Sequence, residues 1–253
     1  MAGPTDGARR AAQADVAVSR DLSGPPTAAQ REALEARMKT AVSLYPALKP
    51  IADKHGVPVS YLMALHVVET RGKGDPMAKE SSAGATGPFQ ITPITRKQYP
   101  PSQQYSTVFE TDADIAAQHL AAAKKAGFGS FGAQAMTYTA GMEGVKRWAG
   151  GAQSGVGQHS KEYVPMAVYA QRTLEERLPD YAKQLERERK MAAADAGMKA
   201  FKEYPYTPMT GGVLGVSEAQ EAASRKARND ARDSAAAEAA AKPQTPYAQY
   251  GYK

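Results

Sequence analysis

The sequence predicts a mostly α-helical protein that carries extended, low-complexity or helical arms at its two ends. No segment alternates apolar and polar residues convincingly, as a half-buried β-strand would. Apolar residues instead recur at spacings of three and four, which is the period of one helix face. Aromatic and branched residues concentrate in the middle of the 253-residue chain, whereas both ends are rich in Ala, Arg, Asp, Gln and Gly. We therefore expect one folded domain between two polar segments.

The composition limits the classes of partner and chemistry. The net charge of +6 and the pI of about 9.3 favour contact with polyanions, but no basic block with interleaved aromatics indicates a specific nucleic-acid motif. The absence of cysteine excludes disulfides and thiolate metal sites. The N-terminal segment lacks the apolar stretch of a secretory signal, and no segment is long and apolar enough to span a membrane. We expect a soluble protein that is not exported by the usual route.

The N-terminal part is expected to begin with an arm and to continue as a helix. Residues 1–26 are polar and have no apolar period, so we predict a flexible or partner-ordered arm. Thr27 and Gln30 have the spacing of a capping box, which starts a helix. That helix carries one apolar stripe, made of Leu34, Met38, Val42 and Tyr45.

The helix expected at 59–70 organises the rest of the chain. Before it, Pro46 and Pro50 should bend or break the chain, and Gly56 should end the short segment that follows them. Apolar residues recur at helical spacing along this helix: Leu62, Leu65 and Val68. Glu69 therefore lies beside the buried stripe rather than opposite it.

The remaining segments follow from the same signals. Glycines and prolines mark residues 71–80 as a loop and residues 99–106 as a connection. Further helices are expected just after Pro93 and over 112–125, 131–138, 144–148, 161–174 and 178–204. The helix at 112–125 should be capped by Thr111 or Asp112, and Gly141 should form a turn.

These features divide the chain into four parts. They are a polar arm (1–26), a folded domain (27–178), a charged helix (179–204), and a linker with an Ala-rich tail (205–253). An Ala-rich helix without a large apolar face cannot bury enough area to hold itself in place. We expect the terminal arms to be loose or docked on a partner.

Glu69 has the position of a general acid. Cleavage of a glycosidic bond requires protonation of the leaving oxygen, which a carboxylic acid with a raised pKa performs well near neutral pH. An apolar helix disfavours the carboxylate form. A glycosidase of the usual kind also needs a second carboxylate, for which Asp75 and Glu80 are the candidates. Acids at such positions are mostly solvated or salt-bridged. The residues alone therefore leave open whether Glu69 is a catalytic acid or an ordinary surface carboxylate.

The segment after this loop fits a clamp on a bound sugar. Gly84 and Gly87 allow the backbone to approach a ligand closely and to take positive φ. Gln90 offers a donor and an acceptor to N-acetyl and hydroxyl groups. A tight turn with a surface glutamine is the alternative reading of the same residues.

Two motifs, in this order, resemble the lytic transglycosylases related to goose-type lysozyme. Glu69-Thr70 falls on the Glu-Ser of that family, and residues 81–90 fall on its Ser-x-x-Gly-Ala-x-Gly-x-x-Gln. Residues 137–141, Thr-Tyr-Thr-Ala-Gly, resemble its Ala-Tyr-Asn-Ala-Gly and precede a Gly-x-Val-x-x-Trp element. The resemblance covers residues 55–168 and implies a lysozyme-like helical domain.

The resemblance also implies roles for individual residues. Glu69 would be the catalytic acid and base, and the substrate-binding residues would be Ser81, Gly87, Gln90, Tyr138 and Thr139. It implies neither a metal nor a cofactor. His66 and Glu69 form a His-x-x-Glu pair, but the other histidines supply no second pair, so we expect His66 to pack near the site rather than bind zinc. Thr139 stands where the family has Asn, and His159 stands where it has Glu.

The activity implied is cleavage of the MurNAc-GlcNAc β-1,4 bond in peptidoglycan glycan strands. Glu69 would protonate the leaving oxygen and then take the proton of the C6 hydroxyl, which closes on C1 to give 1,6-anhydroMurNAc. The substrate supplies the nucleophile, so this mechanism needs no second carboxylate.

A wall-directed activity without an export signal favours a bacteriophage virion enzyme, and the chain resembles the transglycosylase modules of phage internal virion (ejection) proteins. Such a protein is made in the host cytoplasm, carried in the virion interior and delivered to the host periplasm and cell wall, which it opens for genome ejection. Its arms would contact other virion or ejection proteins. The alternatives are an endolysin or secretion-system murein hydrolase, and a catalytically inactive structural virion protein with a lysozyme-like fold.

Overall fold

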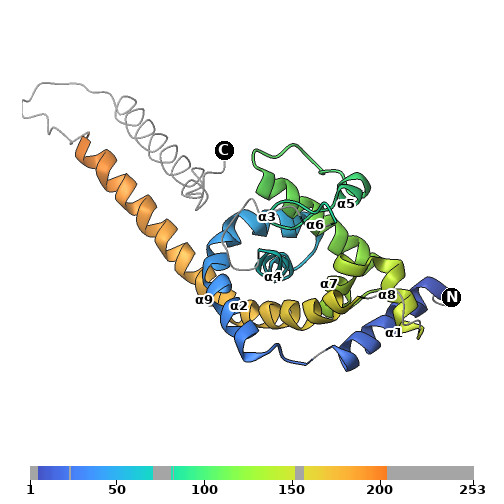
Figure 1. The fold of residues 1–253 in the computed structure, drawn as a ribbon. Helices are drawn as coiled ribbons and strands as arrows, with labels where there is room; N and C mark the ends of the chain where they lie inside the picture. The colour runs from blue at the N-terminus through green and yellow to red at the C-terminus, as the bar shows by residue number, and fades with distance from the viewer. Residues whose placement is uncertain (1–4, 23, 71–80, 82, 152–156, 204–253) are drawn as a thin grey trace, which may run out of the picture. The chain divides into compact units, whose positions relative to one another are not determined.

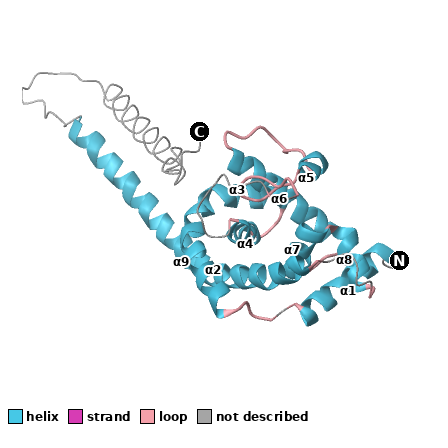
Figure 2. Cartoon of the chain, viewed as in Figure 1, coloured by secondary structure: helices cyan, strands magenta, loops and turns pink. Residues whose placement is uncertain are grey.

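The computed structural model describes residues 5–22, 24–70, 81, 83–151 and 157–203, and these residues are mostly helical (Figure 2). Within these ranges there is no β-strand, and the antiparallel bridge between Thr86 and Ile91 is isolated. The predicted fold class is therefore confirmed. The loop expected at 71–80 and the tail expected from 205 onward lie outside the described residues.

The helices follow one another along the chain with short connections. In order they are α1 (Asp6–Asp21), α2 (Ala28–Ala41), the 3₁₀ turn η1 (Val42–Leu44), α3 (Tyr45–His55), α4 (Val59–Glu69), α5 (Pro93–Gln98), α6 (Val108–Lys125), α7 (Phe131–Ala140), α8 (Met142–Ala149) and α9 (Gln158–Glu203). Among the described residues, those up to Leu178 belong to one compact unit and residues 179–203 to another, and the two are described separately.

Helix α4 is the centre of the first unit, where it is seen end-on with other helices around it (Figure 1). Its residues are apolar on every side, which is typical of a helix that is buried all round. Leu62, Met63 and Leu65 have no exposed surface. The core that surrounds them draws on several helices, including Leu34 and Met38 of α2, Leu48 and Ile51 of α3, Phe109 and Ile115 of α6, and Tyr163 and Leu174 of α9.

The sequence predicted the start of α2 and both ends of α4 well. Thr27 and Gln30 form the expected capping box, in which each side chain accepts a hydrogen bond from the other residue's backbone N–H. Helix α4 ends one residue before the predicted end at Thr70. Gly56 ends α3 with a φ of 64°, a left-handed conformation that glycine adopts without steric cost.

Helix α3 continues through a proline that was expected to break it. Pro46 lies in the first turn, where its missing N–H costs nothing. Pro50 lies inside the helix and removes one backbone hydrogen bond. Burial of Leu48 and Ile51 against the core offsets this loss, so the helix remains continuous.

Helix α6 begins earlier than the sequence analysis expected. Thr107, not Thr111 or Asp112, is its N-cap, and the Thr107 side chain accepts a hydrogen bond from the Glu110 N–H. Burial of Phe109 adds the first turn to the core cluster, and this is why the helix extends to Val108.

Residues 6–21 form a helix that packs on the rest of the chain, whereas a flexible or partner-ordered arm was expected over 1–26. Helix α1 buries Ala11, Ala14 and Val18, which join a core cluster with residues of α6, α7 and α8. A Cβ added to Gly127 would lie 3.1 Å from the Cβ of Ala11, so the two segments approach closely because both residues are small. Small residues carry little hydrophobic signal, and for this reason the pattern was missed.

Asp15 ties α1 to the start of α7. Its carboxylate accepts hydrogen bonds from the Gly129 N–H at 2.6 Å, the Ser130 N–H at 3.1 Å and the Ser130 hydroxyl at 2.8 Å. Ser130 is itself the N-cap of α7. Asp15 therefore places a negative charge at the positive end of the α7 dipole.

Helix α9 is one helix, whereas two were predicted at 161–174 and 178–204. It runs without interruption through Pro165 and Pro179. Up to Leu178 it buries an apolar face that includes Val164, Ala167 and Ala170. Apart from the arm, the division of the chain into domain, charged helix and tail stays a prediction.

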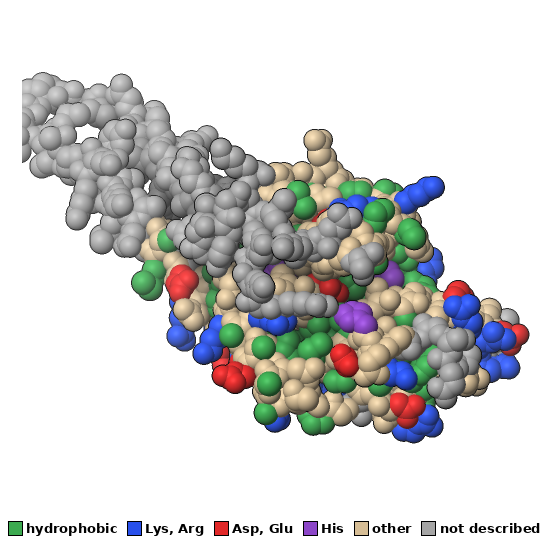
Figure 3. Space-filling model, viewed as in Figure 1, with side chains coloured by type: hydrophobic (Ala, Val, Ile, Leu, Met, Phe, Trp, Pro, Cys, Tyr) green, Lys and Arg blue, Asp and Glu red, His purple; other side chains and the backbone are tan. Residues whose placement is uncertain are grey.

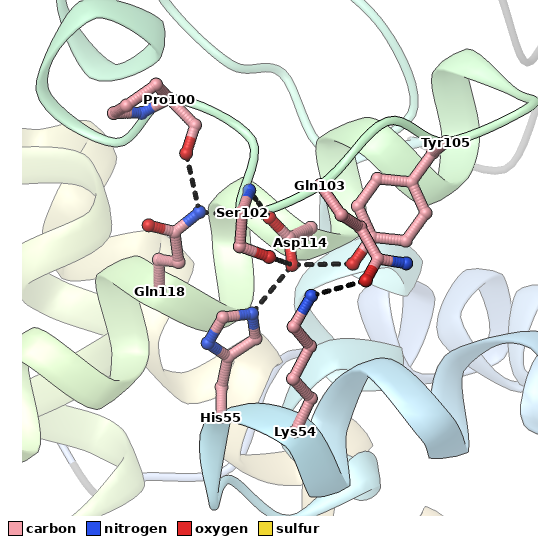
Figure 4. A network of polar contacts seen from close by, with 8 residues as sticks. All are labelled: Lys54, His55, Pro100, Ser102, Gln103, Tyr105, Asp114 and Gln118. Atoms are coloured by element: carbon pink, nitrogen blue, oxygen red, sulfur yellow. Dashed lines mark hydrogen bonds and ion pairs between the residues drawn. The ribbon is translucent and has the colours of Figure 1, made fainter.

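The connection between α5 and α6 is held by a buried carboxylate, Asp114 of α6 (Figure 4). The carboxylate has no exposed surface and accepts hydrogen bonds from several side chains and one backbone N–H. The donors are Ser102 N–H at 2.7 Å, Ser102 hydroxyl at 2.6 Å, Tyr105 hydroxyl at 2.7 Å, His55 Nε2 at 2.6 Å and Gln118 Nε2 at 2.9 Å. These donors hold the pKa of Asp114 below its ordinary value, even though burial alone would raise it.

The surface carries mixed charge. Around α1 and α8, Lys and Arg side chains are interspersed with Asp and Glu side chains (Figure 3). Arg9 pairs with Asp6 and Lys146 pairs with Glu143 in this region. In the described part of the chain, no helix has the length and apolar composition needed to cross a membrane.

Candidate functional site

Glu69 is partly buried and occupies the last turn of the central helix α4. Two side chains anchor the end of this helix. The Thr70 hydroxyl donates to the His66 carbonyl oxygen at 2.9 Å, and Arg37 of α2 donates to the Val67 carbonyl oxygen at 3.2 Å. The C-terminal end of a helix carries partial negative charge, which is unfavourable for a carboxylate beside it.

Residues 86–91 form a tight turn, named here the 86–91 turn. Thr86 and Ile91 exchange two backbone hydrogen bonds of 3.2 and 2.9 Å across it. Gly87 has a φ of 77°, and Gln90 has a φ of 48°, which is uncommon for a residue other than glycine. The Gln90 Nε2 and the Gln90 backbone N–H both donate to the Gly87 carbonyl oxygen, at 3.1 and 3.0 Å. The Gln90 side chain thus stabilises its own turn.

The other carbonyl groups of this turn are bound by side chains of neighbouring helices. His66 of α4 donates through Nδ1 to the Pro88 carbonyl oxygen at 3.1 Å. Tyr138 of α7 donates through its hydroxyl to the Phe89 carbonyl oxygen at 2.7 Å. The turn is therefore fixed both to the helix that carries Glu69 and to the helix that carries Tyr138.

His66 is a packing residue, as the sequence analysis expected. Its ring lies 5.5 Å from the rings of Phe89 and Phe109, measured between centroids. Burial lowers the pKa of His66 to about 4, against a smaller raising effect of the bond to Pro88. His66 is therefore neutral near pH 7 and donates through Nδ1.

Tyr138 lies within the electrostatic reach of two carboxylates. Burial raises the pKa of its phenol well above the ordinary value, and the negative charges of Glu69 and Asp112 raise it further. His119 packs against the Tyr138 ring edge-on at 5.3 Å between centroids. Tyr138 thus remains a neutral hydrogen-bond donor beside Glu69.

Tyr163 of α9 is a second phenol beside Glu69, and the sequence analysis did not identify it as a site residue. Burial raises the pKa of Tyr163 well above the ordinary value, with smaller contributions from Glu69, from Tyr138 and from a contact with the Glu69 carboxylate. That contact falls short of hydrogen-bond geometry, since the Tyr163 hydroxyl forms no hydrogen bond within the described residues. The sequence signal for it is the pair Tyr163-Val164, which matches a Tyr-Val pair that in the resembled family follows the Glu replaced here by His159.

Asp112 of α6 lies directly against Gly87. The Asp112 carboxylate has no exposed surface, and its Oδ1 pairs with Arg96 Nη1 of α5 at 2.6 Å. A Cβ at residue 87 would overlap Asp112 Oδ2. The 86–91 turn therefore requires glycine at position 87 for two reasons, its positive φ and this close approach.

Ser81 and Thr139 make contacts within the protein. The Ser81 hydroxyl oxygen accepts hydrogen bonds from the N–H groups of Ala85 at 3.0 Å and Ala83 at 3.3 Å. The Thr139 hydroxyl donates to Ser160 Oγ at 2.8 Å and so links α7 to α9. The substrate-binding roles of Ser81, Gly87, Gln90, Tyr138 and Thr139 stay predictions.

The second carboxylates considered for a two-acid mechanism, Asp75 and Glu80, lie outside the described residues. Among the side chains that the structure places, no three His, Asp or Glu residues are grouped as metal ligands.

Comparison with known proteins assigns a domain family to this region. Residues 47–160 match the family model of the Transglycosylase SLT domain, which is somewhat less than half of the chain. No curated protein and no solved structure matches the chain. The mostly helical structure is consistent with the lysozyme-like fold of this domain. Glu69, the 86–91 turn and Tyr138 lie inside the matched region, and the match supports lytic transglycosylase activity on peptidoglycan.

Proposed function

We propose that this protein is a peptidoglycan lytic transglycosylase that cleaves the MurNAc-GlcNAc β-1,4 bond and forms 1,6-anhydroMurNAc. The observation that carries the proposal is the placement of Glu69. It lies at the negative end of a buried helix, and its charge acts on the phenols of Tyr138 and Tyr163. The negative end of the helix makes the carboxylate form less favourable, which is what a general acid requires, and the two phenols are neutral near pH 7.

One carboxyl group is sufficient for the proposed reaction. Protonated Glu69 gives its proton to the bridging oxygen as the bond from that oxygen to C1 of MurNAc breaks. The C6 hydroxyl oxygen of the same sugar then bonds to C1, and its proton passes to the Glu69 carboxylate. The acid is regenerated, and no water is consumed.

The 86–91 turn supports this reaction by holding the site in shape. Its fixed backbone conformation provides a preorganised wall for a glycan strand, and preorganisation lowers the cost of reaching the reactive geometry. The Tyr163 hydroxyl can donate to Glu69 or to a sugar oxygen as a neutral phenol. The Tyr138 hydroxyl donates to the Phe89 carbonyl oxygen and can still accept a hydrogen bond from a sugar hydroxyl.

The test is product analysis after digestion of purified murein sacculi. We expect anhydromuropeptides from the wild-type protein and none from Glu69→Gln. Glu143→Gln, a substitution of an exposed side chain of α8, should leave the products unchanged. Products with reducing ends would show that the protein is a hydrolase and not a transglycosylase. No products, with glycan binding retained, would favour the inactive structural protein.

We further propose, on the resemblance stated above alone, that the protein acts from a phage virion and meets other virion proteins through its terminal segments. Mass spectrometry of purified particles is the measurement that checks this location. Absence of the protein from particles, with activity retained, would favour an endolysin or a secretion-system murein hydrolase.

A further inference from the structure

The Asp112–Arg96 pair has an arrangement that stability alone does not explain. Asp112 Oδ1 is paired with Arg96, but Oδ2 accepts no hydrogen bond from the described part of the chain, although it is buried. A buried acceptor without a donor costs about 1–3 kcal/mol. An apolar pair of the same volume would often be as stable or more stable. We therefore looked for a role of the Asp112–Arg96 pair in the site around Glu69.

The contacts of the pair lead to the 86–91 turn. Asp112 Oδ2 occupies the space beside Gly87 that any side chain would need. Arg96 Nη2 lies 3.4 Å from the Thr86 hydroxyl, which accepts its hydrogen bond. The carboxylate and the guanidinium thus contact the first two residues of the turn, while His66 and Tyr138 bind the next two carbonyl groups.

The charge of the pair also reaches the site. Among the charges that act on the Tyr138 phenol, Glu69 has the largest effect, Asp112 the next, and Arg96 a smaller and opposite one. Asp112 and Glu69 therefore act on the same hydroxyl group, and the effect of Asp112 there exceeds the opposing effect of Arg96. Burial raises the pKa of Asp112, and its bond to Arg96 opposes this rise. A negative field makes ionisation of a nearby carboxylic acid less favourable.

We propose that Asp112, held by Arg96, is a positioning residue of this site: it seats the 86–91 turn, and its negative charge favours the protonated form of Glu69. Asp112 does not touch substrate and acts through the turn and through its field. The inference deepens the proposed function, because a protonated Glu69 is what that reaction requires.

Other charged and titratable groups face the same region and must be kept constant in a test. They are Tyr138 of α7, Tyr163 and Glu69 itself, His66 beside Glu69 on α4, His119 of α6, and Arg37 of α2 at the end of α4. None of them is altered in the variants below.

The experiment measures the titration of Glu69 directly, by ¹³C NMR of its side-chain carboxyl in the full-length protein. This readout does not depend on whether the chain cleaves peptidoglycan. Asp112→Asn keeps the shape of the side chain, removes its negative charge and leaves the charge of Arg96. We expect Glu69 to lose its proton at a lower pH than in the wild type. The double variant Asp112→Asn/Arg96→Met removes both charges, and we expect a titration between the two.

Asp114→Asn is the matched control. Asp114 is also a buried carboxylate of α6, but it binds the connection between α5 and α6 and not the 86–91 turn. The Asp114→Asn substitution should lower the free energy of unfolding and leave the pH at which Glu69 titrates unchanged. An unchanged Glu69 titration in both Asp112 variants would overturn the proposal. An equal shift in Asp114→Asn would also overturn it, because the effect would then be a general consequence of loosening α6.

Activity gives a second, separable readout. If sacculi yield anhydromuropeptides, the alkaline limb of the rate against pH should move to lower pH in Asp112→Asn, with about a tenfold loss of rate on that limb for each pH unit of movement. A wild-type protein without products would contradict the proposed function and leave the NMR result to decide the role of Asp112.

Discussion

The Tyr138 hydroxyl donates a hydrogen bond of 2.7 Å to the Phe89 carbonyl oxygen and so joins α7 to the turn beside Glu69. Tyr138→Phe should reduce the rate of glycan cleavage about tenfold or more, because both the turn and the phenol beside Glu69 are altered. Unfolding free energy should fall by only about 1 kcal/mol. Product release from sacculi and urea denaturation measure the two effects.

Tyr169→Phe is the control for this prediction. Tyr169 donates to Glu35 at 3.0 Å, away from the site, so a similar loss of stability should leave the cleavage rate unchanged. Equal rates for the two variants would contradict the role given to Tyr138.

Tyr163→Phe should separate stability from activity. The hydroxyl of Tyr163 is buried and forms no hydrogen bond within the described residues, so its removal relieves a desolvation cost. We expect equal or slightly higher unfolding free energy together with slower cleavage, since the hydroxyl contacts the Glu69 carboxylate. A large loss of stability would show that the hydroxyl is bound after all.

Gly87→Ala should be much more harmful than an alanine at another glycine of similar conformation. The added Cβ would overlap Asp112 and would also strain a φ of 77°. We expect a loss of about 2–4 kcal/mol in unfolding free energy and loss of cleavage. Gly56→Ala is the comparison, because its φ is 64° but no atom lies within 4 Å of the new Cβ. It should cost only about 1 kcal/mol.

Stability should fall as the pH drops below 6.5. Burial lowers the pKa of both His66 and His119 from 6.5 to about 4. A histidine whose pKa is lowered by folding binds fewer protons in the folded state. Its contribution is therefore complete above pH 6.5 and is lost between pH 6.5 and pH 4. With both residues the slope should reach at most about 2.7 kcal/mol per pH unit, measurable by urea denaturation between pH 7.5 and pH 4.5.

His119→Gln tests the source of this slope. The glutamine can still bond to the Thr137 hydroxyl, which lies 3.1 Å from His119 Nε2, but it does not titrate. The slope should fall by about half. An unchanged slope would assign the acid sensitivity to other groups.

Asp15→Ala should destabilise the protein although the residue lies in a segment that reads as an arm. Its carboxylate binds Gly129 and Ser130 at the start of α7, and loss of such a capping interaction costs about 0.5–2 kcal/mol. The cleavage rate per folded molecule should not change. Asp6→Ala, which removes only an exposed ion pair with Arg9, should have almost no effect on thermal unfolding.

The sequence predicted those parts of the fold that depend on local signals. The capping box at Thr27 and the apolar stretch that became α4 are signals of this kind. Helix α1 was missed because its buried face is made of Ala11, Ala14 and Val18, which carry little hydropathy contrast. The continuity of α3 through Pro50 was missed because burial elsewhere in the helix decides it.

For the site, the sequence indicated its members better than their contacts. Glu69, Gln90 and Tyr138 were recognised from motifs, and the structure places Glu69 and Tyr138 close enough to interact. The bond of Gln90 to its own turn and the contact of Asp112 with Gly87 depend on backbone geometry that no local pattern encodes. Tyr163 reaches Glu69 only through long-range packing of α9.

The hydrogen bonds of the 86–91 turn restrict its motion. The carbonyl oxygens of Gly87, Pro88 and Phe89 are all occupied, and displacement of the turn must break bonds to α4 and α7 together. The amide protons of Gln90 and Ile91 should therefore exchange with solvent only through a rare cooperative opening. In the proposed function, a glycan strand that binds to the 86–91 turn loses its own conformational entropy. The turn is already ordered and loses almost none.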